Sequence, residues 1–345
     1  MNKQTVLRVI YAFVVVGCLY GIANSTTNDA EFTIKVANQG STQDEDYVGL
    51  IAMKKLVEAK SDGRIELKIY PSGQFCGSVP ECIGNLQQGV LEVFSTTVGG
   101  TGNFLAEAQV LDLPYVFDND AVAECVLAGP MLDRMRATAL ERELGIHLIG
   151  ASNTGGWRNF ATVSTTIKSP QDLVGLKIRT TPSAIQQELA RQLGANPTPV
   201  SWSEVYTALA TGVVEGSKNG IQDIMNAKLY EHIKNITLDG HSYMAALWWF
   251  SEKSWNTLPT DIKNILLEGF KEQRRVAKEL VAQQESKSYH LFEQAGGTVY
   301  TPTPDQKAQF KTASSQMRQW FIDTYGIEWV SLLEESVSDC ESPSV

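Results

Sequence analysis

Residues 175–200 read GLKIRTTPSAIQQELARQLGANPTPV, and the pattern of side chains changes twice along them. Apolar and charged residues alternate at 176–179, which indicates a strand, and 183–193 indicates a helix that a glycine caps. Residues 196–200 are held extended by their two prolines. The segment therefore predicts strand, helix and extended chain in succession, as in an α/β fold.

The chain of 345 residues is long enough for two medium-sized domains, and this alternation fills two successive blocks. The first block predicts strands at 32–36, 64–70, 91–96 and 147–151 and helices at 47–59, 78–86 and 120–145. The second block predicts strands at 158–163, 176–179, 236–238 and 245–251 and helices at 183–193 and 203–213. We therefore expect two α/β lobes with mainly parallel sheets and a ligand site in the cleft between them.

A helical pattern of unusual length follows the second block. Pro259 opens it, and it reaches Gln294, which is long enough to span both lobes. Residues 304–335 are again helical. The predicted organisation is lobe I at 31–153 and about 241–285, lobe II at 154–240 and about 286–330, and a polar tail at 331–345.

The N-terminus indicates export. Lys3 and Arg8 precede an apolar run at 9–23 that ends in small and polar residues, which predicts a cleaved signal peptide over 1–25 and a periplasmic protein. A transmembrane anchor is the alternative, but the run is shorter than the roughly 20 residues that a bilayer requires.

A lipoprotein signal is a second alternative for the same segment. Val15-Val16-Gly17-Cys18 fits a signal that ends at Gly17, with Cys18 acylated and the protein tethered to the membrane. Apolar residues continue past Cys18, which argues against this reading.

The cysteines are compatible with disulfides. Removal of the signal leaves four of the five, an even number in an oxidising compartment. Cys76 and Cys82 are six residues apart around a glycine and a proline, which favours a bridge over free thiols, whereas pairing of Cys125 with Cys340 stays open. The four histidines show no paired spacing, so we expect no metal site.

Charge and motifs exclude several function classes. The net charge of −10 disfavours nucleic acid as a partner, so an anion site must be a local cluster of Arg, Lys or backbone NH groups. The sequence has no Walker A motif, nucleophile elbow or HExxH motif, and the glycines at 99–102 indicate a turn. The acids at 44–46 are typical of a solvated helix start. We expect neither catalysis nor a cofactor.

Two arginines lie at or near predicted strand ends, Arg158 and Arg179. In a dry cleft the planar guanidinium group can donate two parallel hydrogen bonds to a carboxylate or sulfonate, which makes Arg179 the best candidate anion ligand. The alternative is an ordinary surface ion pair.

Four blocks of sequence carry a family resemblance: 175–179 (GLKIR), 193–199 (LGANPTP), 204–209 (EVYTAL) and 211–216 (TGVVEG). Taken jointly and in this order, they resemble the substrate-binding proteins of tripartite ATP-independent periplasmic (TRAP) transporters, in the branch named for dicarboxylate binding. The resemblance covers roughly 32–325.

The resemblance implies a two-lobed fold like that of periplasmic binding proteins, with hinge strands and a long helix that spans both lobes. It implies capture of a small organic acid anion, a carboxylate or sulfonate, in the cleft between the lobes. The partners would be the small and large membrane subunits of the transporter, and we expect a monomer. The alternatives are a secreted two-lobed enzyme and a binding protein linked to a sensor.

The resemblance also implies roles for individual residues. Arg179 matches the arginine that binds the ligand carboxylate, Arg158 matches an assisting arginine, and Asn219 matches a contact to the same group. Trp202 stands where the family has an aromatic wall residue. Residues 217–221 depart from the family's commoner run, so the ligand is not predicted.

Four further side chains near these motifs have two readings each. Trp157 and Trp249 could face the cleft or belong to the core. Glu81 could accept a hydrogen bond from a ligand or serve the start of a helix. Lys218 could add charge near the anion, but we expect it to be exposed.

Overall fold

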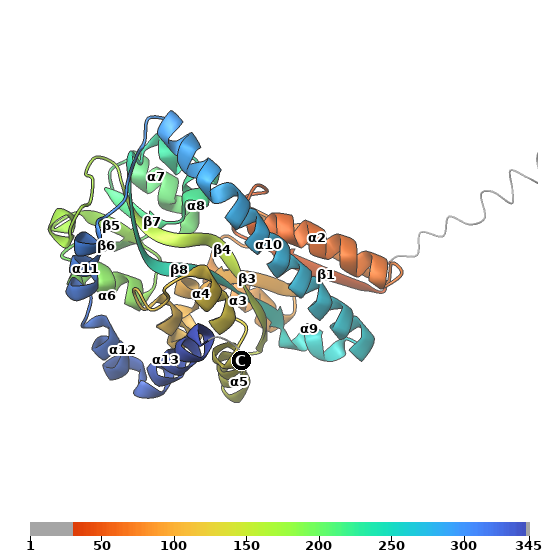
Figure 1. The fold of residues 1–345 in the computed structure, drawn as a ribbon. Coiled ribbons are helices and arrows are strands. Elements are labelled where there is room, and N and C mark those ends of the chain that lie inside the picture. Colours follow the sequence, from red (N-terminus) through yellow and green to blue (C-terminus); the bar gives the residue numbers. More distant parts are fainter. Residues whose placement is uncertain (1–29, 343–345) are drawn as a thin grey trace, which may run out of the picture.

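One sheet of nine strands runs through residues 30–342, the part of the chain that the computed structural model describes (Figure 1). The strands are β1 (Phe32–Ala37), β2 (Ile65–Tyr70), β3 (Val93–Thr97), β4 (Ile146–Thr162), β5 (Lys177–Thr180), β6 (Asn196–Pro199), β7 (Gly216–Asn219), β8 (Asn235–Ser251) and β9 (Thr298–Tyr300). Their order is β2-β1-β3-β8-β4-β7-β5-β6, and β9 pairs with β8. The α/β class expected from the sequence is confirmed.

Twelve α-helices and five 3-10 helices accompany the sheet in the described residues. The α-helices are α2 (Glu45–Lys60), α3 (Val79–Gln88), α4 (Asp120–Val126), α5 (Pro130–Glu141), α6 (Ala184–Gln192), α7 (Val205–Ala210), α8 (Ile221–Asn226), α9 (Glu252–Thr257), α10 (Thr260–Gln294), α11 (Pro304–Ala313), α12 (Met317–Tyr325) and α13 (Ile327–Glu341). The 3-10 helices are η1 (Val98–Asn103), η2 (Ala106–Asp112), η3 (Pro170–Leu173), η4 (Trp202–Glu204) and η5 (Leu229–Glu231).

Two strands, β4 and β8, pass through both lobes and join them. In the first lobe β1 pairs in parallel with β2 and β3, and in the second β5 pairs in parallel with β6 and β7. Between them β4 and β8 run antiparallel along their whole length, β3 pairs with one half of β8, and β7 pairs with the opposite half of β4. The strand pairs β1–β2, β1–β3, β5–β6 and β5–β7 within the lobes are therefore parallel, whereas the pair β4–β8 that joins the lobes is antiparallel.

The sequence predicted two short strands in place of each of these long ones, and that was wrong. In β4 the register shifts between Asn153 and Trp157, where Gly155 and Gly156 have φ of 106° and 77°. In β8 the interruption lies near Gly240, with φ of 59°. Glycine adopts this left-handed backbone without strain, so each strand bends at the junction of the lobes without ending there.

The single helix α10 braces both lobes. It has 35 residues, begins directly after Pro259 and ends at Gln294, as the sequence predicts. It packs on α2 at one end and on α8 and β9 at the other (Figure 1). Gly269 permits the close crossing with α2, because a Cβ there would lie 2.5 Å from a methyl carbon of Val57.

The helix predicted over 120–145 is two helices in the structure. Gly129 precedes Pro130, and α5 begins at that proline, which cannot continue the preceding helix. The break turns α5 against β4.

The C-terminal helix α13 returns to the first lobe. Trp329, Val330 and Leu333 are buried, and the helix packs on α4, α5 and η2. A disulfide between Cys125 and Cys340 joins α4 to α13. Most of the predicted polar tail is thus part of a packed helix.

The second disulfide is the Cys76–Cys82 bridge that the sequence favours, at the start of α3. No helix in the described part of the chain has the length and apolar character needed to cross a bilayer. The signal peptide, Gly17 and Cys18 lie outside the described residues.

The two disulfides differ in the length of chain that they close, which gives a stability prediction. Removing Cys125–Cys340, whose partners are 215 residues apart, should lower the free energy of unfolding by about 3–5 kcal/mol, because the unfolded chain gains most freedom from a long loop. Removing Cys76–Cys82, only 6 apart, should cost about 2 kcal/mol. Urea unfolding of the Cys→Ser pairs measures both, and equal losses would contradict this account.

Candidate functional site

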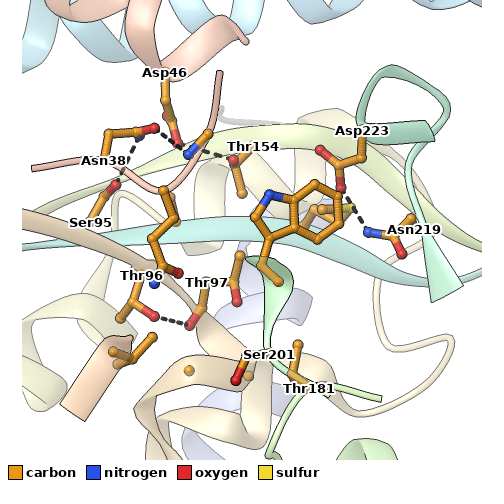
Figure 2. Close-up of a pocket in the computed structure, with 18 of the residues that line it drawn as sticks. Asn38, Asp46, Ser95, Thr96, Thr97, Thr154, Thr181, Ser201, Asn219 and Asp223 are labelled. Carbon is orange, nitrogen blue, oxygen red and sulfur yellow. Dashed lines mark hydrogen bonds between the residues drawn. The ribbon is translucent and has the colours of Figure 1, made fainter. Parts of the chain in front are cut away.

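A cavity of about 290 Å³ lies where the two lobes meet. In Figure 2, Asp46 lies beside Thr154, and Asp223 lies beside Asn219 at the other side of the view. Both lobes contribute to the wall, with Asn38, Asp44, Glu45, Asp46, Ser95 and Thr97 from the first and Arg158, Arg179, Thr181, Trp202, Asn219 and Asp223 from the second.

Arg179 lies on β5, the central strand of the parallel group in the second lobe, and is 3% exposed. Its Nε donates to the carbonyl oxygen of Val200 at 3.0 Å. Neither terminal nitrogen has an acceptor, and no carboxylate lies within ion-pair distance, among the described residues. Burial, and then the charge of Arg158, lowers the pKa of Arg179 to about 9.

Arg158 comes from β4, directly after the bend at the junction, and is 2% exposed. Its NH1 donates to the carbonyl oxygen of Lys218 at 3.0 Å, but its buried Nε has no partner. A buried NH group without an acceptor is costly, and Arg158 lines the cavity, so its guanidinium group is placed to donate to an anion there.

Asn219 and Trp202 complete this side of the pocket. Asn219 ends β7; its Nδ2 donates to Asp223 at 3.0 Å, and its Oδ1 accepts from the Ser217 hydroxyl at 2.6 Å. Trp202 belongs to η4, and its ring lies 5.8 Å from the guanidinium carbon of Arg179. The indole face thus restricts the position of that guanidinium group.

The structure places the other three candidate residues away from this pocket. Trp157 donates its indole NH to Asp120 at 2.6 Å and lines a separate cavity. Trp249 is fully buried in the core, edge-on to Phe104 at 5.2 Å. Glu81 accepts from the backbone NH of Gly77 at 2.9 Å, at the start of α3.

The expectation that Lys218 is exposed was wrong. It is 2% exposed in β7, and its Nζ donates to the carbonyl oxygen of Gln186 at 3.2 Å. Burial, and then the charge of Arg158, lowers the pKa of Lys218 to about 7. It adds positive charge behind the two arginines without lining the pocket itself.

The acids at 44–46 were also misjudged from the sequence. Glu45 and Asp46 are buried at the start of α2 and, with Asp44 and Asp223, form the acidic wall of the pocket. Burial raises the pKa of Asp46 to about 7 and that of Asp223 to about 6. The local sequence held no signal for this, since a solvated helix start has the same composition.

The glycines predicted as a turn also belong to the site. Gly99 and Gly100 lie in η1 and line the cavity. A Cβ at Gly100 would lie 1.9 Å from the hydroxyl oxygen of Thr96, so only glycine fits there. Within the described ranges, no group of three His, Cys, Asp or Glu side chains is placed to hold a metal ion.

Comparison with known proteins gives a consistent result across most of the chain. The model of the bacterial extracellular solute-binding protein family 7 matches residues 36–323. The 2,3-diketo-L-gulonate-binding periplasmic protein of Escherichia coli is 27% identical, over 91% of this chain and 93% of its own length. The sialic acid-binding periplasmic protein of Vibrio cholerae is 28% identical, over 88% of this chain and 93% of its own length.

A solved structure agrees with the sequence comparisons. The TRAP periplasmic solute-binding protein of Sulfurospirillum deleyianum, determined with bound succinate, superposes with a TM-score of 0.83. It is 25% identical, and the match covers 90% of this chain and all of that one.

Lys218 allows a test of the electrostatics of this region. Its folded-state pKa of about 7 lies below the ordinary 10.5, so the unfolded chain binds more protons between these values and stability rises with pH across them. Lys218→Met removes the buried ammonium, and at pH 6 its Tm should exceed that of the wild type by more than about 3 °C.

This difference should shrink as the pH rises toward 9, where the wild-type amine is largely neutral in the folded state. Thermal unfolding followed by circular dichroism measures it, with Lys55→Met on the exposed face of α2 as the control. A lower Tm for Lys218→Met at pH 6 would show that the ammonium is well compensated.

Proposed function

Because this chain belongs to family 7 of the bacterial extracellular solute-binding proteins, the substrate-binding proteins of TRAP transporters, we propose that it captures a small organic acid anion between its lobes. One observation carries the proposal. Arg158 and Arg179 are both buried at the pocket and have no carboxylate partner among the described residues.

Two adjacent buried cations repel each other, and each loses its hydration. Asp223 compensates the charge of Arg179 only in part, and an incompletely compensated buried charge costs several kcal/mol, so the ligand-free site is unfavourable as it stands. A ligand carboxylate supplies the missing charge and two acceptors for the free terminal nitrogens of Arg179, in the bidentate geometry that guanidinium groups favour.

The roles of the lining residues follow from their free hydrogen-bonding groups. Arg179 binds the carboxylate with its two terminal nitrogens, and Arg158 assists through its guanidinium group, which also lines the cavity. Asn219 holds the Asp223 carboxylate in place through its hydrogen bond. Trp202 encloses the remainder of the ligand. Trp157, Trp249 and Glu81 do not line this cavity, and no contact with the ligand is proposed for them.

The ligands named for relatives agree with this class. 2,3-Diketo-L-gulonate, sialic acid and succinate are organic acids, bound by three different proteins. A cavity of about 290 Å³ suits a molecule of similar small size.

Closure of the lobes would report that the site is occupied. A ligand that contacts both lobes stabilises the form in which they are close, and β4 and β8 are the hinge. We propose that the exported monomer, with lobes divided near 153 and 240, then docks on the small and large membrane subunits of a TRAP transporter.

The central test is isothermal titration of the purified protein with succinate, sialic acid and 2,3-diketo-L-gulonate. For any acid that binds, Arg179→Ala should weaken affinity by roughly 30-fold or more, because removing one partner of a desolvated charge pair costs about 2–5 kcal/mol. Arg191→Ala, on the exposed face of α6, is the matched control and should leave affinity unchanged. Equal affinity of wild type and Arg179→Ala would defeat the proposed role.

Capture without chemistry is a separate expectation. The acid recovered from the protein after prolonged incubation should have an unaltered mass, because the proposed site needs only to bind and release. Mass spectrometry of the extracted ligand, with ligand kept in buffer as the control, measures this. A product that appears only with protein would indicate an enzyme.

A further inference from the structure

The acidic wall of the pocket is chemically opposite to its arginine side. Four carboxylates and two guanidinium groups line the cavity, counted over the described residues. None of the four carboxylates has a Lys, Arg or His nitrogen within 4.0 Å in that part of the chain. The carboxylates of this wall therefore lack a cationic partner, and the two guanidinium groups lack an anionic one.

Neutral donors satisfy three of the four carboxylates. Asp44 accepts from Asn226 at 2.7 Å, and Asp223 accepts from Asn219 at 3.0 Å. Asp46 accepts from Ser152, Thr154 and Gln273, each within 3.2 Å. These contacts hold the three side chains in place but do not provide any of them with a cation at ion-pair distance.

Glu45 has no such support. It is 2% exposed and lines the cavity, and within the described part of the chain no other residue donates a hydrogen bond to its carboxylate. Burial, and then the charges of Asp46, Asp223 and Asp44, raise its pKa well above the usual range. Its carboxylate is thus a buried acceptor that receives no hydrogen bond from another described residue and lies among three further acids.

The two ends of the pocket are close enough to influence each other through Asp223. Its ionisation is opposed by Asp44 on one side and favoured by Arg158 and Arg179 on the other. Glu45 and the two arginines also line the same cavity of about 290 Å³, so one small molecule can contact both ends.

Building on the proposed capture of an organic acid, we propose that the ligand is a zwitterion, with its carboxylate on Arg179 and Arg158 and an ammonium group at Glu45. An ammonium has three donors and one positive charge, which supply the hydrogen bond that Glu45 lacks and compensate the wall. A dicarboxylate would instead place a second negative charge against four acids. A hydroxy acid would satisfy Glu45 but leave the charge of the wall unchanged.

Three matched series of probes separate these classes. At chain lengths of four, five and six carbons, isothermal titration compares the ω-amino acid, the ω-hydroxy acid and the dicarboxylate, which differ only in the terminal group. The wild type should bind the ω-amino acid best in at least one series, by about tenfold or more over each of its two partners.

Glu45→Gln tests the contact at the ammonium end. The substitution keeps size and shape and removes the charge, so it should abolish most of the preference for the amino acid over the hydroxy acid. Retained binding of the hydroxy acid and a Tm no lower than that of the wild type would show that the variant is folded. Glu66→Gln, on the exposed surface of β2, is the control and should keep the preference.

The outcomes distinguish this inference from the proposed function. A dicarboxylate or hydroxy acid that binds best at every length, or a preference that survives in Glu45→Gln, overturns the zwitterion. The same holds if succinate, sialic acid or 2,3-diketo-L-gulonate binds while no ω-amino acid does. If no acid of either experiment binds the wild type, the proposed capture of organic acids fails instead.

Discussion

Two guanidinium groups of the same charge, those of Arg158 and Arg179, are buried side by side at the junction of two lobes without a carboxylate partner. Burial of this pair is unfavourable for folding, because each cation has lost water and is repelled by the other. Binding of an anion accounts for its presence. Lys218, also buried, increases the positive potential behind them. The ligand-free protein thus lacks a counter-charge at this position, and we propose that an anion that supplies it also draws the lobes together.

The rest of the fold serves to hold these charges at one place and still allow movement. The strands β4 and β8 bend at the junction, and β4 carries Arg158 there. Strands β5 and β7 bring Arg179 and Asn219 from the second lobe. The long helix α10 packs on both lobes, and the Cys125–Cys340 disulfide fixes the C-terminal helix to the first. In the proposed closure, these connections would restrict the relative movement of the lobes to a bend along β4 and β8.

Sequence reasoning succeeded where the signal was local or matched a family pattern. The strand-helix unit at 175–200, the length of α10 and the positions of Arg158 and Arg179 could all be read in this way. It failed where burial depends on segments far apart in the chain. Lys218 and the acids at the start of α2 look like solvated residues, and only the apposition of the lobes buries them. For the same reason, the sequence around Trp249 does not show whether its side chain lies in the core or in the cleft.

The most direct test of this account is a crystal structure of the protein with a bound organic acid. The account predicts that the ligand carboxylate accepts two hydrogen bonds of about 3 Å from the terminal nitrogens of Arg179, and that both lobes exclude water from this contact. A bound acid whose carboxylate contacts other groups, with the Arg179 side chain turned to bulk solvent, would contradict it.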